Sequence, residues 1–144
     1  MPRLTFPFGP DGLLVPALLG LTAPDLAAAQ ATGAASPAVL PVRGMIDSGT
    51  TVTAVAPGVL ARLNIPPGPA VQTTTAAGPV QVRLYQVSFT IYDLASGVTL
   101  ARPDWTVTNL LHDPDDVDVL FGLDLLREVV LTVNGPGRVF SLDF

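Results

Sequence analysis

The sequence predicts a mostly β protein that forms a single domain. Its 144 residues include 15 prolines and 13 glycines spread along the chain, which interrupt long helices. Short apolar runs separated by turn residues are typical of strands. The chain is long enough to bury its own core, and it has neither internal repeats nor a linker between domains. Residues 1–144 are therefore expected to form one domain.

The order of the expected elements follows from these runs. Strands are expected at 4–8, 13–21, 38–46, 52–55, 70–75, 80–92, 97–101, 104–110, 117–121, 129–133 and 138–143. Helices are expected only at about 57–63 and 124–128. Residues 22–38 are interpreted as an exposed insertion between two strands, in which Thr22 offers a helix start and Gly33 and Pro37 would soon end the helix.

The composition limits the classes of partner. Apolar residues make up 49% of the chain and charged residues 13%, and the mean hydropathy is +0.50. No run approaches the roughly 18–20 apolar residues of a membrane-spanning helix, so apolar surface buried between subunits is the better explanation, and no membrane partner is expected. A net charge of −5 without a basic patch argues against nucleic acid. The absence of cysteine excludes disulfides and thiolate chemistry.

The N-terminal segment can also be interpreted as a secretory signal, because Arg3 precedes the apolar run 13–21. Asp11 and Pro16 interrupt that pattern, and the alternation over residues 4–8 is typical of a strand. The segment is therefore expected to be retained. A cytoplasmic location is expected, with a secreted or periplasmic one as the alternative.

The strongest candidate for a catalytic motif is the tripeptide Asp47, Ser48 and Gly49. It follows an apolar strand that is expected to end at Ile46. Hydrolysis of a peptide by water that only carboxylates activate needs two facing carboxylates that share one proton. This chain supplies one such motif, so a second copy of the chain would have to supply the other. The alternative is an ordinary turn that the Asp47 side chain caps.

A second segment supports the first. Apolar residues 119–121 precede Gly122 and the expected helix 124–128, after which come the two expected strands 129–133 and 138–143. Together, and at this separation, the two segments resemble the retropepsin-like aspartic proteases, which include retroviral proteases and their single-domain bacterial and eukaryotic relatives. The resemblance implies a retropepsin-like acid-protease half-barrel with a flap hairpin and one short helix near the C-terminus, assembled as a two-fold dimer.

Matched residue by residue, the resemblance assigns roles around the motif. It implies that Asp47 is the catalytic aspartate, that the Ser48 hydroxyl links the two active-site loops across the dimer, and that Gly49 leaves room for the substrate. Thr50 and Thr51 are then expected to contact substrate. No metal and no cofactor are expected.

The resemblance also implies a flap, a hairpin that closes over the bound peptide, and residues 71–85 occupy its position. The alternation there flanks a small tip at 76–78. The substrate-binding residues expected in this segment are Thr75, Ala76, Ala77 and Gly78. A plain hairpin without that role is the alternative.

The chain departs from the retroviral pattern at two coupled positions. Viral enzymes usually carry an aspartate four residues after the catalytic one and an arginine just after the second-motif glycine, and these charges pair. Here the two positions hold Thr51 and Leu123. Since both charges are missing together, no unpaired buried charge is left, and the departure does not argue against the fold.

The terminal strands repeat apolar residues with period 2, at Leu4, Phe6 and Phe8 and at Phe140, Leu142 and Phe144. Free edges of this kind promote aggregation. The resemblance implies that the termini of two subunits interleave in one sheet. The alternative is that the two strands pair within one chain.

Other chemistry-bearing residues carry weaker signals. The stretch 112–118 has four aspartates but lacks the spacing of a calcium loop, so we expect a solvated acidic loop. His112 has no nucleophile motif near it. Tyr85 and Trp105 are expected in the core or at an interface.

The leading hypothesis is a homodimeric aspartic endopeptidase acting on a peptide or protein substrate. One alternative is a retropepsin-like dimerisation or peptide-binding module with weak catalysis. Another is a β-rich structural protein in which residues 47–49 only form a turn.

Overall fold

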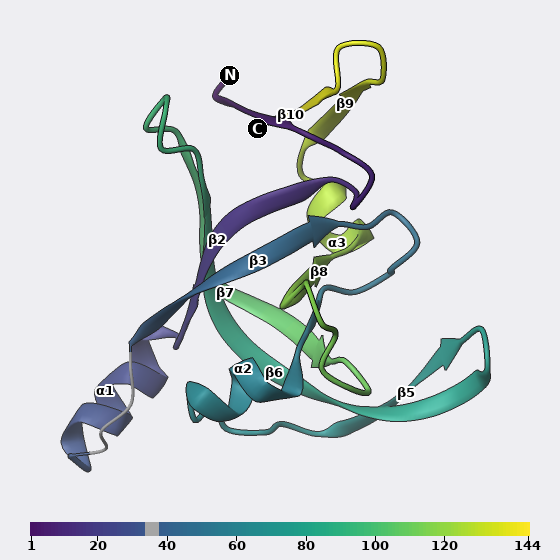
Figure 1. Cartoon of the computed structure of the whole chain (residues 1–144). Coiled ribbons are helices and arrows are strands. Elements are labelled where there is room, and N and C mark those ends of the chain that lie inside the picture. Colours follow the sequence, from purple (N-terminus) through teal and green to yellow (C-terminus); the bar gives the residue numbers. More distant parts are fainter. Residues whose placement is uncertain (34–37) are drawn as a thin grey trace.

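Two β-sheets and three short helices make up the part of the chain that the computed structural model describes, residues 1–33 and 38–144 (Figure 1). The strands are β1 Arg3–Pro7, β2 Leu14–Gly20, β3 Val39–Ile46, β4 Ala54–Val55, β5 Ala70–Thr75, β6 Gly78–Tyr92, β7 Thr99–Asn109, β8 Val119–Phe121, β9 Val130–Asn134 and β10 Val139–Asp143. The helices are α1 Ala23–Ala31, α2 Pro57–Arg62 and α3 Leu123–Leu126. The mostly β prediction is confirmed.

The larger sheet closes on itself. Its strand order is β2-β3-β8-β4-β7-β6-β5, and β2 also pairs with β6, so six strands form a barrel from which β5 extends along β6. The parallel pairing of β3 with β8 places Ile46 beside Phe121. This pairing brings the residue after β3, Asp47, next to the end of β8, 74 positions later in the chain.

The interior of the barrel is filled by aromatic and aliphatic side chains. Strand β6 alternates in and out, so Val87, Phe89 and Ile91 are buried. The ring of Phe89 lies 5.1 Å from that of Phe121 and 5.7 Å from that of Trp105, nearly edge-on to the latter. Each such side chain contributes about 1.5–3 kcal/mol by leaving water.

The smaller sheet, in the order β1-β10-β9, joins the two ends of the chain. Strands β1 and β10 are antiparallel, with Leu4 opposite Leu142 and Phe6 opposite Phe140, and these four side chains are buried. Figure 1 shows the two termini close together. The terminal strands therefore pair within one chain, which is the alternative to the interleaving that the resemblance implied.

One prediction about the strands is wrong. The expected strands 97–101 and 104–110 form a single strand, β7, although Pro103 lies within it. The ladder between β6 and β7 is irregular between Val87 and Phe89, opposite this proline. A bulge tolerates the missing N–H group of proline, so the strand continues through it.

The helices also differ from expectation in one place. The two expected helices are present as α2 and α3, in slightly shorter form, and a third, α1, follows Thr22. The threonine hydroxyl oxygen accepts a long hydrogen bond of 3.5 Å from the N–H of Asp25, and Pro24 lies in the first turn. Helix α1 buries none of its residues, as expected for an exposed insertion; residues 34–37 of that insertion lie outside the described part. No helix in the described ranges is long and apolar enough to cross a membrane.

Candidate active site

The Asp47 carboxylate is held by its own loop, directly after β3. Its Oδ1 accepts a hydrogen bond from the N–H of Gly49, and its Oδ2 accepts one from the hydroxyl of Thr50, both at 2.9 Å. The N–H of Asp47 donates to the carbonyl oxygen of Phe121 at 2.9 Å. Asp47 is half-buried, so both carboxylate oxygens are fixed in direction and one side of the group remains open to solvent.

The segment after β8 supports this loop from beneath. The N–H of Leu123 donates to the carbonyl oxygen of Thr50 at 2.8 Å, and that of Asp124 donates to Thr51 at 3.2 Å. A Cβ atom at Gly122 would lie 2.6 Å from the Thr50 carbonyl oxygen and 3.1 Å from the carbonyl carbon of Val52. Only glycine allows the two backbones to approach this closely.

The carboxylate of Asp124, in α3, is hydrogen bonded to the C-terminal end of the Asp47 loop. Asp124 accepts hydrogen bonds from the N–H of Thr53 (3.1 Å), from its hydroxyl (2.8 Å) and from the indole N–H of Trp105 (2.9 Å). Thr53 is fully buried, and its hydroxyl oxygen also accepts from the N–H of Gly122 at 3.3 Å. This network was missed in the sequence, where the only signal is an aspartate two residues after the second-motif glycine.

The outer surface of the loop faces solvent. Ser48, Gly49, Thr51 and Val52 are all exposed. Within the described part of the chain, the Ser48 side chain makes no hydrogen bond. The loop therefore presents a hydroxyl, a glycine and apolar surface outward, beside the open side of Asp47.

The predicted hairpin of residues 71–85 is present as β5 and the first part of β6. Its tip is closed by the Thr75 hydroxyl, which donates to the carbonyl oxygen of Gly78 at 2.9 Å and accepts from the N–H of Ala77 at 3.2 Å. Gly78 has a φ of +112°, a value that favours glycine. Figure 1 places this tip and the β3–β4 loop on the same side of the molecule. Among the described residues, no hydrogen bond joins the tip, including Ala76, to the Asp47 loop.

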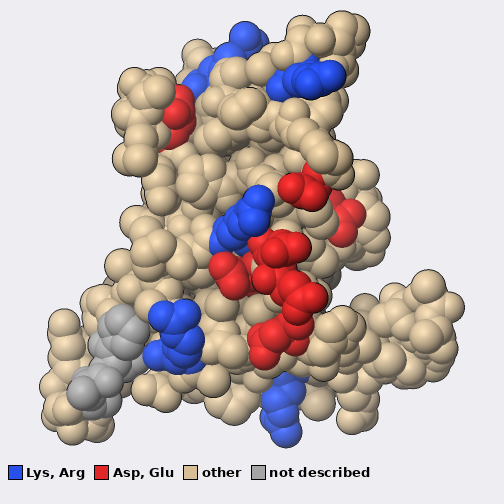
Figure 2. All heavy atoms as spheres, viewed as in Figure 1, with Lys and Arg blue, Asp and Glu red and all other residues tan. Residues whose placement is uncertain are grey.

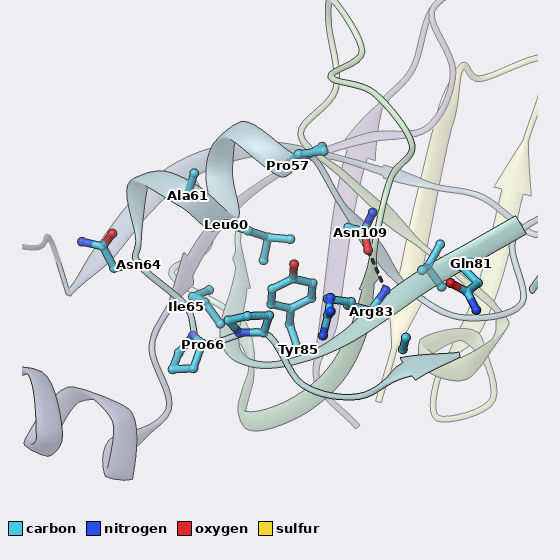
Figure 3. Close-up of a pocket in the computed structure, with 13 residues that line it drawn as sticks. Pro57, Leu60, Ala61, Asn64, Ile65, Pro66, Gln81, Arg83, Tyr85 and Asn109 are labelled. Carbon is cyan, nitrogen blue, oxygen red and sulfur yellow. Dashed lines mark hydrogen bonds between the residues drawn. The ribbon is translucent and has the colours of Figure 1, made fainter. Parts of the chain in front are cut away.

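A cavity of about 690 Å³ lies at the base of the hairpin rather than at Asp47. It opens between α2 and β6, and Figure 3 shows the Tyr85 ring reaching from β6 toward Leu60. The N–H of Arg83 donates to the side-chain oxygen of Asn109 at 2.8 Å, and its guanidinium donates to the carbonyl oxygen of Gly68 at 3.0 Å. Tyr85 thus lines a cavity, whereas Trp105 packs against the core and fastens Asp124.

Two aspartates of the acidic loop, residues 112–118, are hydrogen bonded to the rest of the fold. Asp113 accepts a hydrogen bond from the N–H of Gly58 at 2.8 Å, at the start of α2, and Asp118 accepts one from the N–H of Arg43 at 2.9 Å. Asp115 and Asp116 are exposed, and Figure 2 shows acidic side chains gathered on this face. The described ranges contain no cluster of three or more residues able to hold a metal ion.

Comparisons with known proteins agree with this architecture. A family model described as aspartyl protease matches residues 33–125. A retropepsin-like aspartic protease from Rickettsia conorii has a similar structure, with a TM-score of 0.59 and 13% identity over 98% of this chain and 90% of that one. A structure of EIAV protease complexed with the inhibitor HBY-793 matches 61% of this chain and 76% of its own, with 20% identity and a TM-score of 0.37.

No curated protein sequence matches the chain. The likeness to the Rickettsia conorii structure shows a retropepsin-like fold, as the sequence predicted. The family model covers well over half of the chain, including the Asp47 loop and the segment that supports it. The chain therefore belongs to the aspartyl protease family.

Proposed function

We propose that this protein is an aspartic endopeptidase that cleaves peptide or protein substrates as a two-fold homodimer. The observation that carries the proposal is the state of Asp47: both oxygens are oriented by Gly49 and Thr50, and the carboxylate has an open side on an exposed loop. Each chain has one Asp-Ser-Gly motif, so the pair of carboxylates that the aspartic mechanism needs requires a second protomer.

The chemistry follows from bringing the two Asp47 carboxylates together. Like charges about 3 Å apart resist joint ionisation, so the pair shares one proton, and aspartic proteases are the established example. The ionised carboxylate takes a proton from water, and the protonated one polarises the scissile carbonyl. The tetrahedral intermediate collapses as a proton passes to the leaving nitrogen. The titration belongs to the pair and not to either residue.

The neighbouring residues take supporting roles. In this proposal the exposed Ser48 hydroxyl, which has no partner in the described part of its own chain, bonds across the dimer. Gly49 leaves space for substrate, and Thr50 and Thr51 contact the bound peptide. The hairpin tip, residues 75–78, supplies backbone groups that pair with an extended peptide.

The test compares wild-type protein with Asp47→Asn on a mixed peptide library, read by mass spectrometry from about pH 4 to pH 7. Asp115→Asn is the matched control, because Asp115 is exposed and has no hydrogen bond among the described residues. We expect cuts by wild type and Asp115→Asn that Asp47→Asn does not make, with all three proteins dimeric by sedimentation.

A dimer that makes no Asp47-dependent cut at any pH would contradict the proposal. That result would instead support a dimerisation or peptide-binding module in which catalysis is weak. Binding of library peptides without cleavage, measured on the same samples, would identify that module directly.

A further inference from the structure

The cavity at the base of the β5–β6 hairpin is separate from the Asp47 loop. Its volume of about 690 Å³ lies within the range of about 300–1,000 Å³ that is typical of small-molecule sites. Among the described residues, none from the Asp47 loop, 47–51, and none from the hairpin tip, 75–78, lines it. The cavity is therefore a second candidate site, which the proposed peptidase mechanism does not use.

The apolar part of the cavity wall is preformed. Leu60 of α2 and Ile65, in the segment after α2, are buried, and Pro57, Pro66 and Pro67 line the cavity with them. Proline fixes the backbone angle φ, so these residues hold the wall in one conformation before a ligand arrives. A wall that is already ordered lowers the entropic cost of binding an apolar group.

The polar part of the wall comes from β6. Gln81, Arg83 and Tyr85 alternate along this strand, and all three line the cavity. Arg83 is anchored, because its Nη1 donates to the carbonyl oxygen of Gly68 at 3.0 Å and its backbone N–H donates to Asn109 at 2.8 Å. Among the described residues, the other guanidinium N–H groups and the Tyr85 hydroxyl have no hydrogen-bond partner.

The charge of the wall selects an anion. Arg83 is the only charged side chain among the described residues that line the cavity, although the whole chain has a net charge of −5. A guanidinium matches a carboxylate with two parallel hydrogen bonds, and one arginine balances the single charge of one carboxylate. The Tyr85 hydroxyl can donate a further bond to the same group.

We propose that this cavity binds a small organic acid that has an aromatic or aliphatic body. The carboxylate bonds to Arg83 and Tyr85, and the body packs against Leu60, Ile65 and the prolines. A free organic acid and the C-terminal residue of a peptide share this chemistry. Because Arg83 and Tyr85 belong to β6 and Leu60 belongs to α2, the bound acid bridges the base of the hairpin and that helix.

The test is an NMR titration of the isotope-labelled protein with hydrocinnamate, a phenyl ring on a short chain that ends in a carboxylate. We expect saturable shifts of the backbone amides of cavity residues Ala61, Asn64 and Val82. The neutral amide, hydrocinnamamide, should bind roughly tenfold or more weakly, because it lacks the charge that bonds to Arg83. Equal binding of acid and amide, shifts confined to the Asp47 loop, or no saturable shift would overturn the proposal.

Variants identify the residues that bind the acid. Arg83→Gln removes the charge, and Arg62→Gln is the matched control, because Arg62 is exposed on α2 and does not line the cavity. We expect the dissociation constant of hydrocinnamate to rise roughly tenfold or more for Arg83→Gln and to stay near the wild-type value for Arg62→Gln. Wild-type affinity in Arg83→Gln, or an equal loss in both variants, would contradict a direct bond to Arg83.

A third variant blocks the space without changing the charge. Ala61 is exposed and lines the cavity from α2, so Ala61→Phe places a ring at the cavity with little effect on the core. We expect this variant to lose saturable binding while its circular dichroism matches that of wild type. Wild-type affinity in a folded Ala61→Phe protein would place the acid elsewhere.

A dipeptide distinguishes the two sources of the carboxylate. N-acetyl-alanyl-phenylalanine with a free C-terminus carries the same ring and charge as the end of a peptide. Tighter binding of the dipeptide than of hydrocinnamate, lost in Arg83→Gln, assigns the cavity to peptide C-termini, and the reverse order assigns it to free organic acids. Binding is measured without cleavage, so failure of this inference leaves the peptidase standing, and a protein without Asp47-dependent cuts leaves this inference intact.

Discussion

The carboxylate of Asp124 receives two hydrogen bonds from Thr53, one from the backbone N–H at 3.1 Å and one from the hydroxyl at 2.8 Å. A third comes from the indole of Trp105. The charged pair of retroviral enzymes is missing here, since its positions hold Thr51 and Leu123. In this chain the Asp124 carboxylate, bonded to neutral donors, holds the Asp47 loop in place instead. The carbonyl oxygen of Thr51 also accepts a hydrogen bond from the N–H of Asp124.

Replacing Asp124 with asparagine should weaken this hydrogen-bond network. The asparagine amide has one oxygen, so its NH₂ group would face a hydrogen-bond donor of Thr53 or Trp105, and two donors cannot bond to each other. We therefore expect the free energy of unfolding to fall by about 1–3 kcal/mol. Urea denaturation measures this loss. The emission of Trp105, the only tryptophan, should shift as its hydrogen bond is lost. Asp115→Asn is the control, and equal stability of the two variants would show that the network contributes little.

Gly122 gives a second test of the support beneath the loop. A Cβ atom there would press on the backbone of Thr50, at 2.6 Å from its carbonyl oxygen, and backbone yields less readily than a side chain. We expect Gly122→Ala to cost about 1–3 kcal/mol of stability and to lower peptidase turnover by moving Asp47. Gly135→Ala meets nothing within 4 Å and serves as the control. Wild-type turnover in Gly122→Ala would show that the loop tolerates displacement.

Local patterns in the sequence predicted the local parts of this structure. The alternation around residues 76–78 predicted the β5–β6 hairpin, because a hairpin is built from neighbouring residues. The bond between Asp124 and Thr53 joins residues 71 positions apart, and no periodicity reports such a contact. The split of β7 into two expected strands was wrong, because a bulge that lets a strand continue through Pro103 depends on the partner strand as well as on the proline.

The partners of the terminal strands could not be chosen from the sequence either. Alternating apolar residues show that a strand has a buried face. They do not show whether the strand that pairs with it belongs to the same chain. The structure supplies the register, with Arg3 opposite Asp143, and the side chains of this pair form an ion pair. The assignment of Asp47 and the residues around it to catalysis remains a prediction that the experiments above test.

The turn after β6 should contribute to stability in a pH-dependent way. Hydrogen bonds from Ser96, and then from the N–H of Ala95, lower the pKa of Asp93 below its ordinary value of 3.8. A lowered carboxyl pKa stabilises the fold above the unfolded pKa, and the stability is lost as the pH falls through the folded value. Wild type should therefore have a higher Tm than Asp93→Ala at neutral pH, and the gap should close in acid. A gap that persists in strong acid, or appears equally in Asp115→Ala, would rule out this origin.

Leu4 distinguishes pairing of the termini within a chain from pairing between chains. Its side chain is fully buried opposite Leu142, so Leu4→Ala should leave a cavity and cost about 2–5 kcal/mol of unfolding free energy. Because β1 pairs with β10 of its own chain, the variant should keep the wild-type dimer dissociation constant in sedimentation equilibrium. Thr5→Ala, exposed on the same strand, is the control. If Leu4→Ala instead weakened the dimer at concentrations where each protomer stayed folded, β1 would belong to the interface, and the ladder with β10 would not be the arrangement in solution.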